Sequence, residues 1–139
     1  MPPAPGDLAT LEAFVNSDDD LGAPEAAFRE ALRALLADKR DPEAIAALDR
    51  AARDAHLAVR FEPDGSVRLR AVEDGLIGSL LAIVARAQAD GTWSRMKACR
   101  ADDCRWAFYD RSRNRSRAWC SMRECGNRAK ARSYRARQR

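Results

Sequence analysis

The chain has 139 residues, of which 46% are hydrophobic and 33% are charged, and its formal net charge is +4. This length fits one ordinary domain or two small ones, and no run approaches the roughly 20 apolar residues that a membrane span needs. The opening residues, MPPAPG, lack the basic and apolar segments of a secretory signal, so we expect a cytoplasmic protein that does not contact a membrane.

The charge is distributed unevenly along the chain. Residues 93–139 contain 15 Lys and Arg against 4 Asp and Glu, a formal +11, whereas residues 1–92 contain 10 basic and 17 acidic residues, a formal −7. An acidic part followed by a strongly cationic end is typical of a protein that binds a polyanion, above all nucleic acid.

The first half of the chain is predicted to be helical after a disordered lead-in, residues 1–7. Apolar side chains recur at the period of an α-helix in residues 8–16, from Pro24 to about Ala37, and again after Asp41. Pro24 and Pro42 occupy first-turn positions, where proline is favoured, and Asp41 suits an N-cap. The third helix is expected to bury one apolar stripe, formed by Ile45, Leu48 and Ala52.

The apolar period then changes from 3.6 to 2. Residues 57–61 and 67–71 alternate on either side of the turn sequence PDGS, which predicts a β-hairpin. Residues 74–90 are apolar on nearly every side and are followed by Gly91, which predicts a central helix buried by the first three helices and the hairpin. Residues 8–92 should therefore form a mainly helical domain with one hairpin.

All four cysteines fall within 27 residues, as Cys99, Cys104, Cys120 and Cys125. Two short-spaced pairs separated by a basic stretch suit one Zn2+ ion held by four thiolates. Residues 93–139 have too few large apolar side chains to fold around a core of their own, so they need a staple. Reduced thiols favour a metal in the cytoplasm; two disulfides are the alternative.

Around the cysteines we expect a small module that resembles a zinc ribbon or treble clef. Residues 95–99 are predicted to form a strand that leads into a turn. The aromatic residues 106–109 and residues 118–120 would pair as a hairpin on either side of a cationic turn, residues 111–117.

The module should end in a basic helix. Ser121 and Glu124 have the spacing of a capping box, which would place Cys125 in the first turn of a helix that reaches about Arg137. The predicted fold class is therefore α+β, with a mainly helical N-terminal domain followed by a four-cysteine module, residues 93–139.

The predicted last helix and the cationic turn carry the candidate nucleic-acid contacts. Spacing of i, i+4, i+7 and i+11 aligns four arginines on one helix face, two further basic residues widen it, and three alternate in the turn. These residues are, in the helix, Arg128, Lys130, Arg132, Arg135, Arg137 and Arg139, and, in the turn, Arg113, Arg115 and Arg117. Arginine outnumbers lysine 13 to 2 in residues 93–139, which favours bidentate contacts with phosphate and guanine. The alternative is a solvated basic tail.

The cysteine segment resembles the CGNR zinc-finger family. The resemblance rests on CRADDCRWAFYD from Cys99, SRNR from Ser112, WCSM from Trp119 and CGNRAK from Cys125, and it covers about residues 93–137. LEAFVNS from Leu11 resembles the opening of the ABATE domain, which precedes the finger in that family. The resemblance implies a bacterial, zinc-dependent regulator of the stress-induced kind that binds DNA.

We therefore expect a DNA-binding transcription regulator with one structural zinc ion, and not an enzyme. Four cysteine ligands would leave no open coordination position, and no catalytic motif is visible. Double-stranded DNA is the expected partner, at the bacterial nucleoid, and the N-terminal domain would form a homodimer or sense an unidentified effector. A thiol-based redox sensor and an RNA- or ribosome-associated module are the alternatives.

Overall fold

The computed structural model describes residues 2–73 and 75–138. Its elements are, in chain order, α1 (Leu8–Asn16), α2 (Ala23–Ala37), α3 (Pro42–Ala55), β1 (Leu57–Phe61), β2 (Val67–Ala71), α4 (Leu76–Asp90), the 3-10 helix η1 (Thr92–Arg95), β3 (Met96–Ala98), β4 (Ala107–Tyr109), the π-helical turn η2 (Met122–Gly126) and α5 (Asn127–Arg137). Strands β1 and β2 form one antiparallel hairpin, and β3 and β4 form another. This arrangement confirms the α+β prediction. Within the described ranges no helix is both long and apolar enough to cross a membrane.

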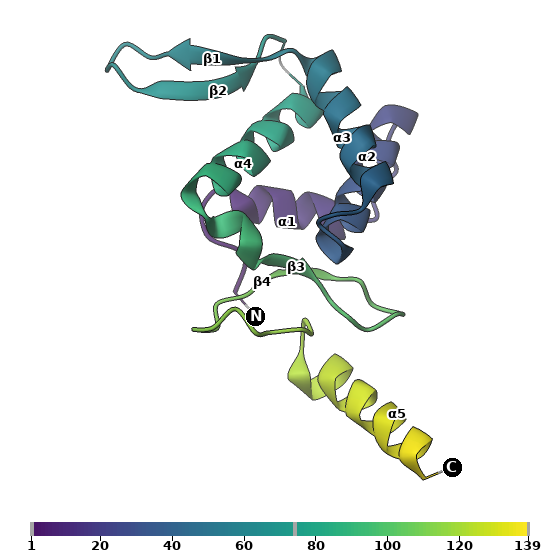
Figure 1. The fold of residues 1–139 in the computed structure, drawn as a ribbon. Helices are drawn as coiled ribbons and strands as arrows, with labels where there is room; N and C mark the ends of the chain where they lie inside the picture. The colour runs from purple at the N-terminus through teal and green to yellow at the C-terminus, as the bar shows by residue number, and fades with distance from the viewer. Residues whose placement is uncertain (1, 74, 139) are drawn as a thin grey trace.

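The core lies among helices α1 to α4, with one hairpin on each side of them (Figure 1). Leu11 of α1, Leu32 of α2 and Leu80 of α4 are at most 1% exposed. Trp93 of η1 and Met96 of β3 belong to the same apolar cluster. The core therefore continues past residue 92, where the charge of the sequence changes sign.

Local signals account for the ends of α3, but not for its buried face. The Asp41 carboxylate accepts hydrogen bonds from the backbone N–H groups of Glu43 and Ala44 at 3.0 and 3.1 Å, as an N-cap does. The prediction that Ile45 is buried was wrong: it is 47% exposed, and Ala44 is buried with Leu48 instead. Alanine on the inner face lets α3 approach its neighbours closely, whereas isoleucine would hold it away.

The first hairpin sits on the start of α4 at a position that only glycine allows. A Cβ atom on Gly78 would lie 2.5 Å from the Cβ of Ala71 in β2. At the other end of the helix, Gly91 adopts a left-handed conformation, with φ 84°, and ends α4 as predicted. The hairpin covers α4 near this contact, but Val59 and Phe61 farther out are 60% and 80% exposed.

The segment before α1 is not the disordered lead-in that the sequence predicts. Ala4 is 3% exposed and belongs to the apolar core. Arg111 donates a hydrogen bond to the Pro3 carbonyl at 2.6 Å, and Asp7 forms an ion pair with Arg86 of α4. The prolines of this segment restrict the unfolded chain, so ordering residues 2–7 costs less entropy than ordering a flexible tail would.

The side-chain amide of Asn16 links the helical part to the second hairpin. The side chain of Asn16, the last residue of α1, donates to the Ala107 carbonyl at 2.9 Å and accepts from the Ala107 N–H at 2.8 Å. Ala107 lies in β4 and is 1% exposed. Asn16 thus satisfies both backbone groups of a buried strand residue on the edge that β3 leaves open.

Replacing Asn16 with alanine should lower the free energy of unfolding by about 2 kcal/mol, because a buried N–H and a buried carbonyl lose their partners. Urea denaturation followed by circular dichroism measures this change. Asn114→Ala, at an exposed loop position, is the matched control. Equal midpoints for both variants would show that the joint at Ala107 contributes little.

Candidate metal centre

The four cysteine sulfurs converge on one point. All of them lie within 4.8 Å of one another, with 3.6 Å between the sulfurs of Cys104 and Cys120 and 3.7 Å between those of Cys120 and Cys125. A tetrahedral zinc ion with Zn–S bonds of about 2.3 Å separates its sulfurs by about 3.8 Å. A disulfide requires about 2.05 Å, and all four cysteines are free. The geometry therefore fits one zinc ion with four thiolate ligands and not two disulfides.

Each of the four ligands comes from a different local structure. Cys99 directly follows β3, and its N–H donates to the Trp106 carbonyl at 2.8 Å. Cys104 closes the turn between β3 and β4, where its N–H donates to the Ala101 carbonyl at 3.0 Å. Cys120 lies in an irregular segment, and Cys125 lies in η2. A strand end, a turn and a helix start meet at the cluster, as the sequence predicts.

The predicted hairpin between residues 106–109 and 118–120 was wrong. Strand β4 pairs with β3, and residues 118–120 form no strand. They make one backbone hydrogen bond with the turn that carries Cys99 and Cys104 (residues 99–104, the first knuckle), from the Arg100 N–H to the Ala118 carbonyl at 3.0 Å. The chain after β4 folds around the Asp110 side chain, so it does not run back along the strand.

The start of the last helix matches half of the predicted capping box. The hydroxyl of Ser121 accepts from the Glu124 N–H at 3.3 Å. Among the described residues, the Glu124 carboxylate does not make the reciprocal bond, and the Gly126 N–H instead donates to the Ser121 carbonyl at 3.0 Å. This wider π-helical turn carries Cys125 into the cluster before the regular helix α5 begins at Asn127.

The sulfurs are held in a way that favours a bound cation. Cys99 and Cys125 are 4% and 2% exposed. Burial raises the pKa of Cys120, and the neighbouring sulfurs raise it further. Burial also opposes ionisation of Cys99, but hydrogen bonds from the backbone N–H groups of Cys120 and Ala101 and from the Cys125 and Cys120 thiols together lower its pKa. Four thiolates therefore cannot share this space alone, and zinc would supply the charge that allows them to ionise.

Arg128 connects the cluster to the first knuckle. Its guanidinium donates to the Cys125 sulfur at 3.1 Å and to the Asp103 carboxylate at 2.6 Å. One zinc ion with four thiolates carries a net charge of −2, so a guanidinium beside a ligand sulfur offsets part of it. The sequence placed Arg128 among the nucleic-acid contacts, whereas these two bonds assign it a role inside the metal centre.

This geometry agrees with the comparison with known protein families. Residues 95–138 match the CGNR zinc finger. The match begins in η1, contains all four cysteines and ends just after α5. It confirms the resemblance for this segment and supports a structural zinc ion. No curated protein matches the chain.

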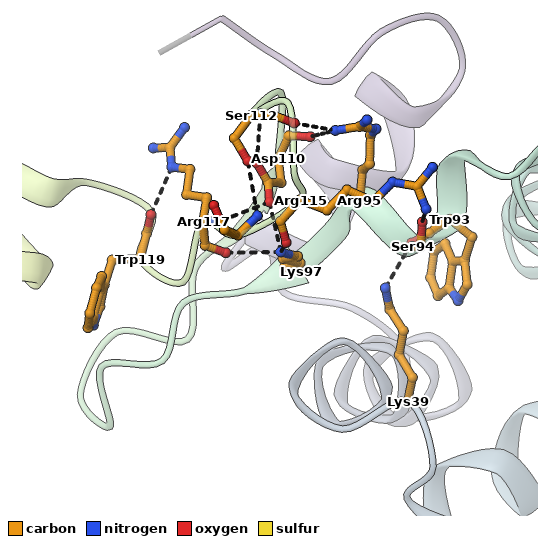
Figure 2. A network of polar contacts seen from close by, with 11 residues as sticks. Lys39, Trp93, Ser94, Arg95, Lys97, Asp110, Ser112, Arg115, Arg117 and Trp119 are labelled. Atoms are coloured by element: carbon orange, nitrogen blue, oxygen red, sulfur yellow. Dashed lines mark hydrogen bonds and ion pairs between the residues drawn. The ribbon is translucent and has the colours of Figure 1, made fainter.

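Asp110 organises the cationic turn of the CGNR finger, as Figure 2 shows. This fully buried carboxylate accepts from Lys97 Nζ at 2.7 Å and from the N–H groups of Ser112 and Arg117 at 2.8 and 3.0 Å. Burial alone would raise its pKa, but these hydrogen bonds outweigh burial and hold the pKa of Asp110 well below its usual range. Lys97 also donates to the carbonyls of Arg115 and Arg117, which closes the loop around the ion pair. This network was not predicted from the sequence, where a single acidic residue before a run of arginines is its only trace.

The arginines of the turn have different environments. Arg113 is exposed, and Arg115 is exposed while donating to the Ser94 hydroxyl at 3.1 Å. Arg117 lies over the Phe108 ring, 5.0 Å from its centre, and donates to the carbonyls of Trp119 and Cys120. Arg117 therefore holds the backbone that leads to a zinc ligand.

The remaining candidate contacts lie on α5. Lys130, Arg132, Arg135 and Arg137 are all exposed. Arg139 lies outside the described residues.

Replacing Arg128 with alanine should speed the transfer of zinc to a chromophoric chelator by about 10-fold, since the Cys125 sulfur loses its charged donor. The zinc-transfer rate of Arg128→Lys should lie between those of wild type and Arg128→Ala, because a lysine keeps the charge but cannot bridge Cys125 and Asp103 with a planar guanidinium. Arg135→Ala removes the same charge from the same helix without touching a sulfur and should leave the rate unchanged. Equal rates for the alanine variants at positions 128 and 135 would contradict the assigned role.

Asp110→Asn should destabilise the protein by about 3 kcal/mol at pH 7, because it breaks a buried ion pair and turns one acceptor into a donor. Thermal or urea unfolding of the zinc-loaded protein measures the loss, with Asp102→Asn as an exposed control. The pKa of Asp110 is lowered on folding, so its stabilisation is present above the ordinary value of 3.8 and is lost as the pH falls below it. The difference between wild type and variant should narrow accordingly in acid; a constant difference would exclude ionised Asp110 as its source.

Proposed function

We propose that the protein is a DNA-binding transcription regulator in which zinc is structural and no reaction is catalysed. The observation that carries this proposal is the state of α5. From Asn127 to Arg137 it contains five basic residues and no acidic one, and its described side chains are all exposed. It extends away from the body of the molecule, to which η2 connects it (Figure 1).

Helix α5 contributes little to the stability of the rest of the protein. An isolated helix of 11 residues is marginal in water, and none of the α5 side chains that the structure describes is buried. The metal centre supports it from one end, through Cys125 and Arg128. Anchoring at one end leaves the whole length of the helix available to a ligand outside the chain.

The dimensions and charge favour duplex DNA as that ligand. A helix about 10–12 Å across fits a DNA major groove about 12 Å wide. The major groove of duplex RNA is too deep and narrow for side chains to read. We propose that direct contacts come from exposed side chains only: Arg113, Arg115, Lys130, Arg132, Arg135 and Arg137, extended by Arg139. Arg117 and Arg128 would act indirectly, by holding the finger in shape.

The roles of the N-terminal part are also proposals. Residues 8–92 would be an ABATE-like domain that places the regulator under the control of a stress signal in a bacterial cytoplasm, by the resemblance of residues 11–17. The family match covers residues 95–138 and does not reach this part. The burial of Cys99 and Cys125 favours a structural zinc site over a redox sensor, because oxidants need access to the sulfur.

The double variant Arg132→Ala, Arg135→Ala tests the proposal. We expect zinc-loaded protein to bind labelled duplex DNA in fluorescence anisotropy, and the variant to bind at least about 10-fold more weakly. Each phosphate contact that is lost should make the slope of log K against log salt shallower by about 0.9. The double variant Arg60→Ala, Arg68→Ala removes the same charge from the β1–β2 hairpin and should bind as wild type.

Unchanged affinity and slope in the α5 variant would remove this helix from the interface. Competition at equal salt separates the two kinds of nucleic acid: structured RNA that displaces the duplex more effectively than unlabelled DNA would replace the DNA proposal. A solvated tail would show neither binding nor a dependence on zinc.

A further inference from the structure

The β1–β2 hairpin carries an apolar face that its own chain covers in part. The register pairs Leu57 with Ala71, Val59 with Leu69, and Phe61 with Val67, and directly paired residues lie on the same face of a hairpin. Helix α4 covers the base of this face, where Gly78 meets Ala71. Farther out, three side chains are exposed: Val59 by 60%, Phe61 by 80% and Val67 by 53%.

The opposite face of the hairpin is polar and exposed to solvent. The alternate positions place Arg60, Arg68 and Arg70 on it, all exposed. Arg70 pairs with Glu62 at 3.1 Å, and Asp64 accepts from the Ser66 N–H and hydroxyl within the turn. The polar side chains of the hairpin are thus solvated or hydrogen-bonded, while the apolar side chains on the outer half of the other face are exposed to water.

Such a face is costly to leave in water. A two-stranded hairpin is marginal unless a third layer packs on it, and α4 provides that layer only at one end. Exposed large apolar side chains are therefore concentrated on the outer half of this face, at Val59, Phe61 and Val67. Contiguous apolar patches on a soluble protein mark interaction surfaces.

We infer that this face is a dimerisation surface, and that the same face of a second copy of the chain covers it. No charged residue occupies the paired positions 57, 59, 61, 67, 69 and 71, so two copies can meet there without bringing like charges together. Two such faces would pack as the layers of a small β-sandwich, with the arginines of each hairpin on the outside.

The charge of the N-terminal part supports a meeting at the hairpin and not elsewhere. Residues 57–71 contain three arginines against Glu62 and Asp64, a formal +1, whereas the rest of residues 1–92 sums to −8. Two acidic bodies repel each other over most of their surface, and the hairpin is where this repulsion is weakest. This face, formed by residues 57–61 and 67–71, is separate from the residues proposed to contact nucleic acid.

Sedimentation equilibrium of the zinc-loaded full chain tests it. We expect wild type at about twice the 15.4 kDa monomer mass at micromolar concentration. Phe61→Asp should weaken the dimer by at least about 100-fold, because it would bury a charge against the apolar face of the second copy. Arg68→Ala, on the opposite face, and Phe61→Leu should remain dimers. Circular dichroism and zinc content establish that each variant is folded.

Two further readouts decide what covers the face. A dimer held by apolar contact should persist in 1 M salt, about ten times the ionic strength at which exposed charges are already largely screened at 10 Å. A photoreactive benzoylphenylalanine at position 61 should cross-link to the partner's hairpin. A monomeric wild type, dissociation by salt, or cross-links to the groove that Phe28 and Ile77 line between α2, α3 and α4 would each overturn the inference.

Discussion

The convergence of four sulfurs within 4.8 Å is the constraint on which the C-terminal third depends. Zinc fixes the relative positions of the β3–β4 turn, the segment around Cys120 and the start of α5, none of which has enough apolar surface to do so. The same centre then determines the direction of α5, because Cys125 is a ligand and Arg128, one turn later, holds a ligand sulfur and Asp103. A charged helix without a packed face can project from the molecule only because its first turn is anchored in this way.

The β3–β4 hairpin makes the metal centre and the helical core parts of one structure. Ala107 and Tyr109 pack with the helical core, whereas Phe108 between them packs with the cysteines. Successive residues of a strand point to opposite faces, so this small sheet is a wall with the core on one side and the zinc cluster on the other. Asn16 pairs with the free edge of β4. Just before β3, Lys39 donates to the Trp93 carbonyl at 2.8 Å (Figure 2).

Periodicity and spacing were sufficient to predict the helices, the first hairpin and the zinc ligands, because each of these depends on residues close in sequence. Which strands pair, and which groups each arginine contacts, could not be predicted in the same way. Strands of three residues carry almost no pattern, so the pairing of β4 with β3 is decided by the cysteine turn between them. The arginines were equally ambiguous: Arg117 and Arg128 have the same chemistry as Arg113 and Arg135, and only the fold places two of them against a carbonyl or a sulfur. The prediction that Ile45 is buried was wrong for a related reason, because close packing of the helices places the smaller Ala44 on the inner face.

The two oppositely charged parts of the chain do not neutralise each other. Every ion pair among the described residues joins partners within residues 7–86 or within residues 97–128. The parts are connected instead by buried apolar side chains, Trp93 and Met96, and by the neutral amide of Asn16. Salt screens charges but not such contacts, so the connection should keep its strength under conditions that weaken binding to a polyanion. Most of the positive charge of the finger therefore stays available to a ligand from outside, as the proposed contact with a phosphate backbone requires.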